Sequence, residues 1–278
     1  MENIILIETS TSLCSVALAQ DGKITAYRES SAPKAHASLT AVFVQEVLQE
    51  GGIGLSDCDA VCVSMGPGSY TGLRVGVSTA KGLCFGSGKP LLAVGTLNTL
   101  VAQALACQNE SNTVIPSKVH TVIPSEVEGS PYRFIIPMID ARRMEVYAAV
   151  FKSASNAATV IPSENTVIPS ENTVIPSEVE ESPSYTQITE TAPAIIDESS
   201  YAEYLEQGPC LFIGDGAGKC ADVIKHPNAH FCQCNPKASA MLAPAIAAYK
   251  EKRFEDVAYF EPFYLKEFVA TVSKKKLW

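Results

Sequence analysis

An acidic residue followed by three hydroxyl side chains stands near the start of the chain. Glu8 ends the apolar stretch 4–7, and Thr9, Ser10 and Thr11 come directly after it. A carboxylate at a strand end beside hydroxyl groups could hold a metal ion or orient a water molecule. Because Glu8 is a single carboxylate and polar residues commonly end strands, we expect a structural role for it.

Two glycine-rich stretches, Gly66–Ser69 and Gly214–Lys219, lie where strand-to-helix turns are expected. Such a turn can bind an anion, since backbone amides and the helix dipole converge there. The first stretch matches neither the Walker nor the dinucleotide-binding pattern. The second has the wrong spacing for a Walker loop, and Cys220 stands where that loop needs a hydroxyl. We therefore expect both stretches to be tight connections.

The remaining candidates for chemistry are isolated. His36 stands at the expected start of a helix with no second histidine nearby, so metal ligation is disfavoured. Asp140 precedes Arg142 and Arg143 at an expected hairpin tip, where an ion pair or an anchor for the turn is favoured over contact with a partner. No combination supplies a nucleophile with its base, a metal-binding set or a complete phosphate cradle. These residues predict a protein that is not an enzyme.

The spacing of the nine cysteines predicts neither a disulfide framework nor a zinc site. Cys58 and Cys62 are separated by three residues and Cys232 and Cys234 by one, while the others are scattered. Paired CxxC spacing is missing. We expect a reduced, cytoplasmic protein, because the first residues run directly into a strand pattern and do not resemble a signal peptide.

Length and charge limit the classes of function. A chain of 278 residues with 46% apolar residues can bury one large core or two smaller ones. Its net charge of −9 argues against a broad nucleic-acid-binding surface, which would be basic. If RNA is involved, we expect another protein to make most of the contacts with it. No apolar stretch is long enough for a bilayer span, so no membrane contact is expected.

Hydrophobic patterning and turn signals predict an α/β fold. The elements expected in the first half are strands at 4–8, 13–18 and 23–29 with a hairpin at 21–22, a helix over 36–50, a strand at 60–65, a helix over 71–86 capped by Ser69 or Thr71, a strand at 90–94 and a helix over 96–107. The pattern begins again with strands at 134–140 and 145–151, a short helix at 201–206, a strand at 210–214, a helix over 217–224 and a final helix over 236–252. This repetition predicts two similar ribonuclease-H-like lobes.

The helix expected over 71–86 has one face that is nearly bare of side chains. Gly72, Gly76 and Ala80 are spaced four apart and therefore share this face. Each interior glycine costs up to about 1 kcal/mol of helix stability relative to alanine. We therefore expect a second backbone to approach closely, as in a tight contact with a helix of another protein.

The pentapeptide Thr-Val-Ile-Pro-Ser occurs five times, beginning at residues 113, 121, 159, 166 and 173. Proline in every copy excludes a helical heptad, and the period is too short for a solenoid. We predict two surface insertions without chemistry, at about 110–131 and 158–184. The first lobe then covers 1–109 and the second covers 132–278, whose C-terminal helix is expected to pack back on the first lobe.

Several motifs together resemble a known family. They are residues 5–11 with 14–18, 66–74, 139–147 and 261–265. They resemble the TsaB family of bacterial tRNA threonylcarbamoyladenosine biosynthesis proteins, also called YeaZ. Residues of the structural motifs of that family correspond here to Glu8, Gly66, Gly68, Ser69, Thr71, Asp140 and Arg142. Glu8 stands where many members have aspartate, which weakens a role in handling phosphate, and the pentapeptide insertions are not a family feature.

The resemblance implies a two-lobed fold of the actin, Hsp70 and sugar-kinase superfamily and a role without catalysis. Family members pair with the paralogous threonylcarbamoyl transferase TsaD and with the ATPase TsaE to form N6-threonylcarbamoyladenosine in tRNA. ATP and a divalent metal would belong to those partners, this chain would have no cofactor of its own, and it would meet tRNA only within the complex. The family pairs through helices of the first lobe, which could also form a homodimer. The implied partner interface consists of His36, Leu39, Phe43, Gly72, Arg74, Gly76 and Ala80.

Two enzymatic alternatives belong to the same superfamily. An ATP-dependent phosphotransferase needs a second phosphate loop and a catalytic carboxylate, and neither is complete here. A metallopeptidase is suggested by the glycoprotease label that relatives have carried, but His36 has no second ligand. ATP binding with turnover by the isolated chain would favour the phosphotransferase.

Overall fold

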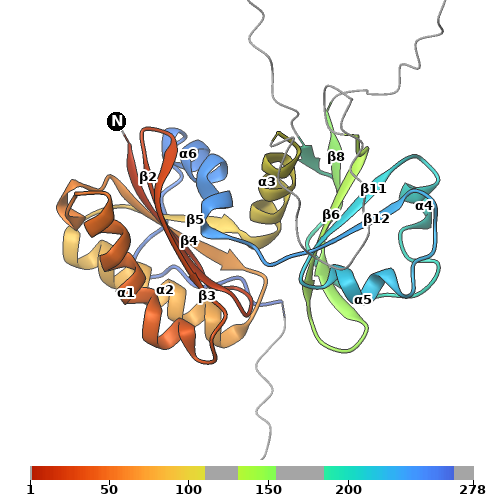
Figure 1. The fold of residues 1–278 in the computed structure, drawn as a ribbon, viewed down its shortest axis with the longest axis horizontal. Helices are drawn as coiled ribbons and strands as arrows, with labels where there is room; N and C mark the ends of the chain where they lie inside the picture. Colours follow the sequence, from red (N-terminus) through yellow and green to blue (C-terminus); the bar gives the residue numbers. More distant parts are fainter. Residues whose placement is uncertain (1, 110–130, 155–184, 266–278) are drawn as a thin grey trace, which may run out of the picture.

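Two lobes, each built on one twisted sheet, lie side by side with helix α3 between them (Figure 1). The structure is a computed structural model that describes residues 2–109, 131–154 and 185–265. The insertions expected at about 110–131 and 158–184 lie almost entirely outside these residues.

The first lobe contains a five-stranded sheet in the order β3-β2-β1-β4-β5. Its elements are β1 (Asn3–Glu8), β2 (Cys14–Gln20), β3 (Lys23–Ser30), α1 (Ala35–Glu50), the 3₁₀-helix η1 (Leu55–Asp57), β4 (Ala60–Gly66), α2 (Tyr70–Ser87), β5 (Leu91–Gly95) and α3 (Thr96–Asn109). The pairs β1–β2 and β2–β3 are antiparallel, whereas the pairs β1–β4 and β4–β5 are parallel. The parallel strands are almost entirely buried, as expected for apolar runs covered on both faces.

The second lobe repeats this arrangement in the order β10-β7-β6-β11-β12. Its elements are β6 (Phe134–Asp140), β7 (Glu145–Ala148), β8 (Phe151–Ser153), β9 (Tyr185–Gln187), β10 (Ala192–Ile195), α4 (Ala202–Leu205), β11 (Cys210–Gly214), α5 (Ala217–Ala221) and β12 (Ala229–Gln233). Strands β6 and β7 form the hairpin, and β6, β11 and β12 are parallel. Since both sheets have the same strand order and directions, the predicted duplicated ribonuclease-H-like fold is confirmed.

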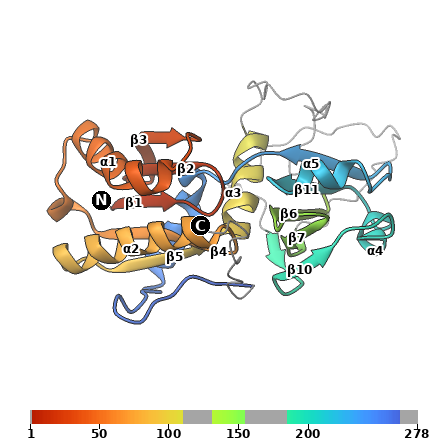
Figure 2. The same ribbon diagram turned by 90° about the horizontal axis from the view of Figure 1, so that it is seen from below.

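Helices cover both faces of the first sheet. Helices α1 and α2 pack next to each other on one face, as Figure 2 shows from below. The 3₁₀-helix η2 (Ala238–Met241) and helix α6 (Leu242–Lys250) follow the second lobe in sequence but pack on the opposite face of the first sheet. Helix α3 contacts the second sheet and shares a buried cluster with β6 and β11. The two lobes are therefore joined by α3 and by the chain that returns to α6.

Several expected elements differ from the observed ones. The strand expected at 145–151 is divided into β7 and β8, and the final helix expected over 236–252 is shorter, since η2 and α6 cover only 238–250. The short strands β9, β10 and β12 were not expected. Among the helices within the described ranges, none has the length and apolar character that a bilayer crossing requires.

Candidate functional site

The turn after β1 is the first candidate site, and Glu8 holds it in place. One carboxylate oxygen of Glu8, Oε1, accepts hydrogen bonds from the Ser10 amide (2.7 Å) and from the Ser64 hydroxyl of β4 (2.9 Å). Glu8, Thr9 and Ser10 are completely buried. Burial raises the pKa of Glu8 to about 7, against the hydrogen bonds from Ser10, Ser64 and Thr9 that lower it. Glu8 is thus a buried clamp between β1 and β4, which agrees with the structural role expected for it.

The glycines of the following loop and helix close this turn against the rest of the chain. The Ser69 amide donates a hydrogen bond to the Ser10 carbonyl (2.6 Å). A Cβ atom at Gly68 would overlap Ser10, and one at Gly72 would overlap the Thr9 carbonyl oxygen. A Cβ atom at Gly76 would overlap the Thr9 hydroxyl. The turn is therefore packed directly beneath the first turns of α2, and its backbone does not form an open cradle for a phosphate group.

This packing overturns the docking role expected for the bare face of α2. Gly72, Gly76 and Ala80 are buried within the chain itself. The second backbone that approaches this face is the chain's own turn at Thr9, because a glycine spacing predicts a close contact without indicating its partner. Phe43 is likewise a core residue, 8% exposed.

The other expected interface residues lie nearer the surface. Leu39 is half-buried and packs against the first-lobe core, and His36 is half-buried in the first turn of α1. Arg74 is exposed, with its guanidinium over the ring of Tyr70 (5.4 Å to the centroid). Ser69 caps α2, as one of the two expected caps, because its hydroxyl accepts the Gly72 amide hydrogen bond, whereas Thr71 lies inside the helix.

The outward faces of α1 and α2 form a second candidate site. We call this surface the outer helix face, defined by Ala37, Ala41, Val42, Ser78, Gly82 and Phe85, all of which are exposed. Phe85 is 87% exposed and Val42 is 42% exposed. The exposed positions of α1 from residue 37 to 49 carry no charge, and Arg74 is the one charged residue among the exposed positions of α2. An exposed surface that is small, apolar and uncharged is typical of a protein–protein contact.

The turn after β6 in the second lobe is held by Lys219. Its Nζ forms an ion pair with Asp140 (2.5 Å) and donates to the carbonyls of Arg143 (2.8 Å) and Glu145 (2.7 Å). Asp140 also accepts the Arg142 amide hydrogen bond (2.7 Å). Asp140 thus anchors the turn as expected, although its ion pair is with Lys219 and not with either arginine side chain.

The glycine-rich stretch that carries Lys219 also packs against its own lobe. A Cβ atom at Gly214 would overlap the Met138 carbonyl oxygen, and one at Gly216 would lie 2.9 Å from Val146. Asp215 accepts the Asp140 amide hydrogen bond (2.9 Å), and burial raises the pKa of Asp215 to about 6. This confirms the interpretation of the stretch as a strand-to-helix turn.

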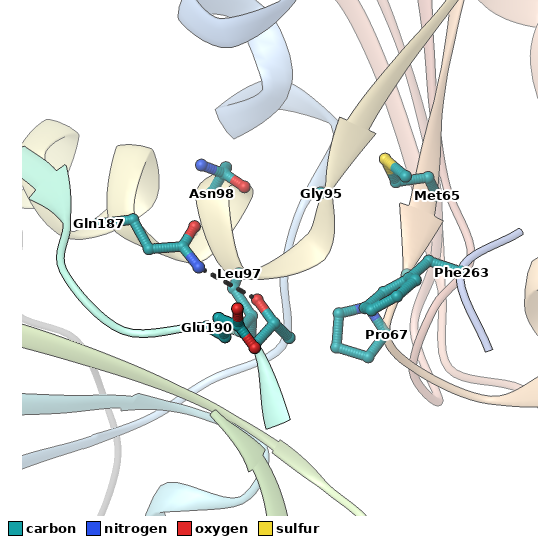
Figure 3. Close-up of a pocket in the computed structure, with 10 residues that line it drawn as sticks. Met65, Pro67, Gly95, Leu97, Asn98, Gln187, Glu190 and Phe263 are labelled. Atoms are coloured by element: carbon teal, nitrogen blue, oxygen red, sulfur yellow. Dashed lines mark hydrogen bonds between the residues drawn. The ribbon is translucent and has the colours of Figure 1, made fainter. Parts of the chain in front are cut away.

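A cavity of about 430 Å³ lies between the lobes, at the ends of β4 and β5 (Figure 3). Its wall consists of Met65, Gly66, Pro67, Gly95, Leu97, Asn98, Gln187, Glu190, Thr191 and Phe263. The Phe263 amide donates to the Met65 carbonyl (2.7 Å), so the C-terminal segment forms part of the wall. The described residues of the lining include the carboxylate of Glu190 and no Lys, Arg or His, which makes this lining a poor match for a nucleotide phosphate.

The sequence did not indicate the second-lobe side of this cavity. Gln187, Glu190 and Thr191 follow the second insertion, in a stretch for which we expected no element. The available signal was the strand propensity of Tyr185, Thr186 and Ile188. Phe85 was also missed, although it directly precedes Gly86 in the expected helix. Within the described ranges, no three His, Cys, Asp or Glu side chains are placed to hold a metal ion.

Comparisons with known proteins place these features in a family. The family model described as TsaD, tRNA N6-adenosine threonylcarbamoyltransferase, matches residues 29–274. The tRNA threonylcarbamoyladenosine biosynthesis protein TsaB of Escherichia coli is 34% identical over 153 residues, which are 55% of this chain and 56% of that protein. The tRNA N6-adenosine threonylcarbamoyltransferase of Jannaschia is 47% identical over 66 residues, which are 24% of this chain and 18% of that enzyme.

Solved structures agree on the fold. YeaZ from Pseudomonas aeruginosa superposes with a TM-score of 0.69 and 22% identity, covering 95% of this chain and all of that one. The sequence match to the E. coli protein spans little more than half of its length. The resemblance to TsaB is confirmed, and the chain belongs to the family described as TsaD, tRNA N6-adenosine threonylcarbamoyltransferase.

Proposed function

We propose that this chain acts without catalysis, as the partner that a TsaD-type threonylcarbamoyltransferase requires to form N6-threonylcarbamoyladenosine in tRNA. The similarity to TsaB of E. coli, which is named for that biosynthesis, supports the pathway. The similarity of part of the chain to the transferases supports descent from a common two-lobed ancestor. ATP, a divalent metal and the tRNA would be held mainly by the transferase and by a TsaE-type ATPase.

One observation carries the proposal of a non-catalytic role. The turn after β1 is filled by the chain's own backbone, because Gly68, Gly72 and Gly76 leave no space between α2 and residues 9–10. In an α/β enzyme, the loops at the carboxyl ends of the strands are where ligands bind. Here the corresponding loop of the first lobe is closed, and the one of the second lobe is held by Lys219. The part of the cavity wall that the structure describes carries no cationic side chain.

The outer helix face is the surface that we propose for the partner. It replaces the glycine face expected from the sequence, since that face is buried, and it keeps the same two helices. Phe85 and Val42 supply apolar area, and the small residues Ala41, Ser78 and Gly82 allow the backbones of two helices to approach closely. The same face would serve a homodimer, so self-association and pairing with the transferase would compete.

Co-purification followed by a modification assay tests this function. The chain and its transferase paralogue are mixed with the ATPase, tRNA and a threonylcarbamoyl donor, and modified adenosine is measured with and without this chain. We expect modification to depend on the chain and the transferase to elute with it. Full modification without the chain would contradict the proposal.

A direct titration separates this role from the phosphotransferase alternative. The isolated chain is titrated with ATP and Mg²⁺, and ADP release is followed. We expect no turnover, because both strand-end turns are closed and none of the described residues that line the cavity is a cation. Saturable ATP binding with turnover would instead favour the phosphotransferase.

A further inference from the structure

Cys232 and Cys234 lie on the same side of one strand and at its end. Cys232 is the fourth residue of β12, and Cys234 directly follows the last one, Gln233. Residues two apart in a strand point to the same face. Both cysteines pack against the cluster formed by α3, β6 and β11, whereas Ala229 and Phe231 face the opposite cluster around α5. The two thiols therefore share one surface beneath α3.

This pair differs from the other cysteines in accessibility. Cys14, Cys58, Cys62, Cys84, Cys210 and Cys220 are buried, while Cys232 and Cys234 are half-buried. Among the described strands, β12 pairs only with β11, so its other edge is not covered by a ladder. Of the cysteines whose side chains the structure describes, these two are the ones that are not fully buried.

The electrostatics favour reaction at Cys232. A hydrogen bond from the Cys234 thiol lowers the pKa of Cys232, although partial burial raises it. Burial raises the pKa of Cys210 in the neighbouring strand to about 12. The thiolate is the nucleophile in thiol–disulfide exchange, so Cys232 is the better attacking group.

The spacing allows a bond between the two sulfurs. Two residues of strand span about 6.6 Å between Cα atoms, at the upper end of the range of about 4.4–6.8 Å that disulfides accept. A disulfide also requires Cβ atoms about 3.5–4.5 Å apart, so the strand must contract locally between the two cysteines. This contraction can occur at Cys234, which lies beyond the last residue of β12. The Cys234 amide donates a hydrogen bond to the Gly214 carbonyl of β11 (3.3 Å).

We propose that Cys232 and Cys234 form a dithiol site that low-molecular-weight disulfides oxidise to an intramolecular disulfide. The Cys232 thiolate attacks one sulfur of the small disulfide, forms a mixed disulfide and releases one small thiolate, which takes a proton from solvent. Cys234 then loses its proton to solvent and attacks the Cys232 sulfur, which releases the second small thiolate, and this thiolate takes a proton from solvent. Two electrons pass from the two cysteines to the small disulfide, and a dithiol reverses the reaction.

The site lies where the chain leaves the second lobe for the first. The side chain of Gln103 in α3 holds this crossing segment through both of its amide atoms: it donates to the Asn235 carbonyl (3.1 Å) and accepts from the Lys237 amide (3.1 Å). The Ala238 amide then donates to the Ser15 hydroxyl of β2 (3.0 Å). Contraction of the backbone at Cys234 would displace this segment, which joins the two lobes.

Peptide mapping of the oxidised full-length chain tests the proposal. The chain is equilibrated with oxidised glutathione, quenched with acid, denatured, alkylated and digested with trypsin. Cleavage after Lys225 and Lys237 yields the peptide 226–237, which contains Cys232 and Cys234 and no other cysteine. We expect this peptide to be unalkylated and lighter by two hydrogens than the reduced peptide, and to be restored by dithiothreitol. The peptide that contains Cys210 should remain fully alkylated.

Two single variants test the order of the steps. In Cys234→Ser, we expect glutathione to accumulate as a mixed disulfide on Cys232. In Cys232→Ser, we expect much less glutathione on Cys234. Alkylation of both cysteines in peptide 226–237 at the level of Cys210 would overturn the proposal, and so would a cross-link from either cysteine to a third one. The experiment uses neither the transferase nor tRNA, so its result is independent of the proposed function.

Discussion

The Thr9 side chain lies directly against Gly76, with no space for a Cβ atom between them. Thr9 follows β1, and Gly76 is in the second turn of α2, so this contact locks the first strand-end turn under the helix. The relationship explains why α2 tolerates glycine at a position where it weakens the helix. Gly76 therefore contributes to the packing of the fold and is not exposed to a docking partner.

Gly76→Ala should therefore destabilise the chain. The added methyl group overlaps the Thr9 hydroxyl, and such overpacking costs about 1–3 kcal/mol of unfolding free energy, partly offset by the helix-propensity gain of up to about 1 kcal/mol. Urea denaturation measures this loss. The matched control is Gly82→Ala in the same helix, where nothing lies within 4 Å of the added Cβ. There we expect a gain of about 0.5–1 kcal/mol, from helix propensity alone.

A double-mutant cycle identifies the cause of the loss at Gly76. Thr9→Ala removes the hydroxyl that the new methyl group would meet, so the two substitutions together should cost less than the sum of the single costs. Strict additivity would show that the loss arises elsewhere. A fully stable Gly76→Ala chain that no longer bound the transferase would restore the interface expected from the sequence.

The buried Glu8 carboxyl should make stability depend on pH. Burial raises its pKa from 4.5 to about 7 in the folded chain, so the folded state holds this proton more tightly than the unfolded state does. Its contribution is complete below the unfolded value and is lost as pH rises through about 7. The change is on the order of 3 kcal/mol.

Glu8→Gln isolates this contribution, because the amide remains neutral. Unfolding free energies are measured for both chains at about pH 5 and about pH 8, on either side of the folded pKa. We expect the wild-type chain to lose stability relative to Glu8→Gln at the higher pH. Since Asp215 titrates equally in both chains, it cancels in the difference. Parallel pH profiles would mean that Glu8 does not titrate in this range.

Phe85→Asp should weaken pairing with the transferase and leave folding unchanged. Phe85 is 87% exposed, so its replacement should alter the unfolding free energy by less than about 0.5 kcal/mol. A buried aromatic contact in an interface contributes about 2 kcal/mol, which corresponds to roughly 30-fold in Kd. Calorimetric titration of the paralogue measures the effect.

Ile195→Asp, at a 78% exposed position of the second lobe, is the control and should bind the transferase with the wild-type Kd. Equal affinities for both variants would exclude the outer helix face.

Lys219→Met should loosen the turn after β6. The substitution removes the ammonium group from Asp140 and from two backbone carbonyls, and we expect a loss of about 1–3 kcal/mol. Hydrogen exchange at the Arg142 amide, which donates to Asp140, should accelerate. Lys225→Met is the control, because the hydrogen bond of the Lys225 ammonium within the described residues goes to the Ala221 carbonyl, four residues earlier at the end of α5. Unchanged stability with loss of ATP binding would instead identify Lys219 as a phosphate ligand.

Local signals in the sequence were sufficient for much of the fold. The apolar runs of β1, β4, β6 and β11, the Asp21-Gly22 hairpin and the Ser69 cap all depend on neighbouring residues, and each was found close to its expected position. The order of these signals, repeated in the second half, was enough to predict two similar lobes. The position of Glu8 at a strand end was also visible, but its hydrogen bonds with Ser10 and Ser64 were not.

Contacts between distant residues were decided by the tertiary structure. The spacing of Gly72 and Gly76 indicated that a backbone must come close, but only the fold identifies that backbone as the turn at Thr9, more than 60 residues earlier in the chain. The short strands β9, β10 and β12 gain their stability from ladder partners elsewhere, so their own sequences carry a weak signal. The shared surface of Cys232 and Cys234 likewise follows from β12 lying at a sheet edge beneath α3. Sequence determined which segments could form elements, and the packing of those elements determined which faces remained for a partner.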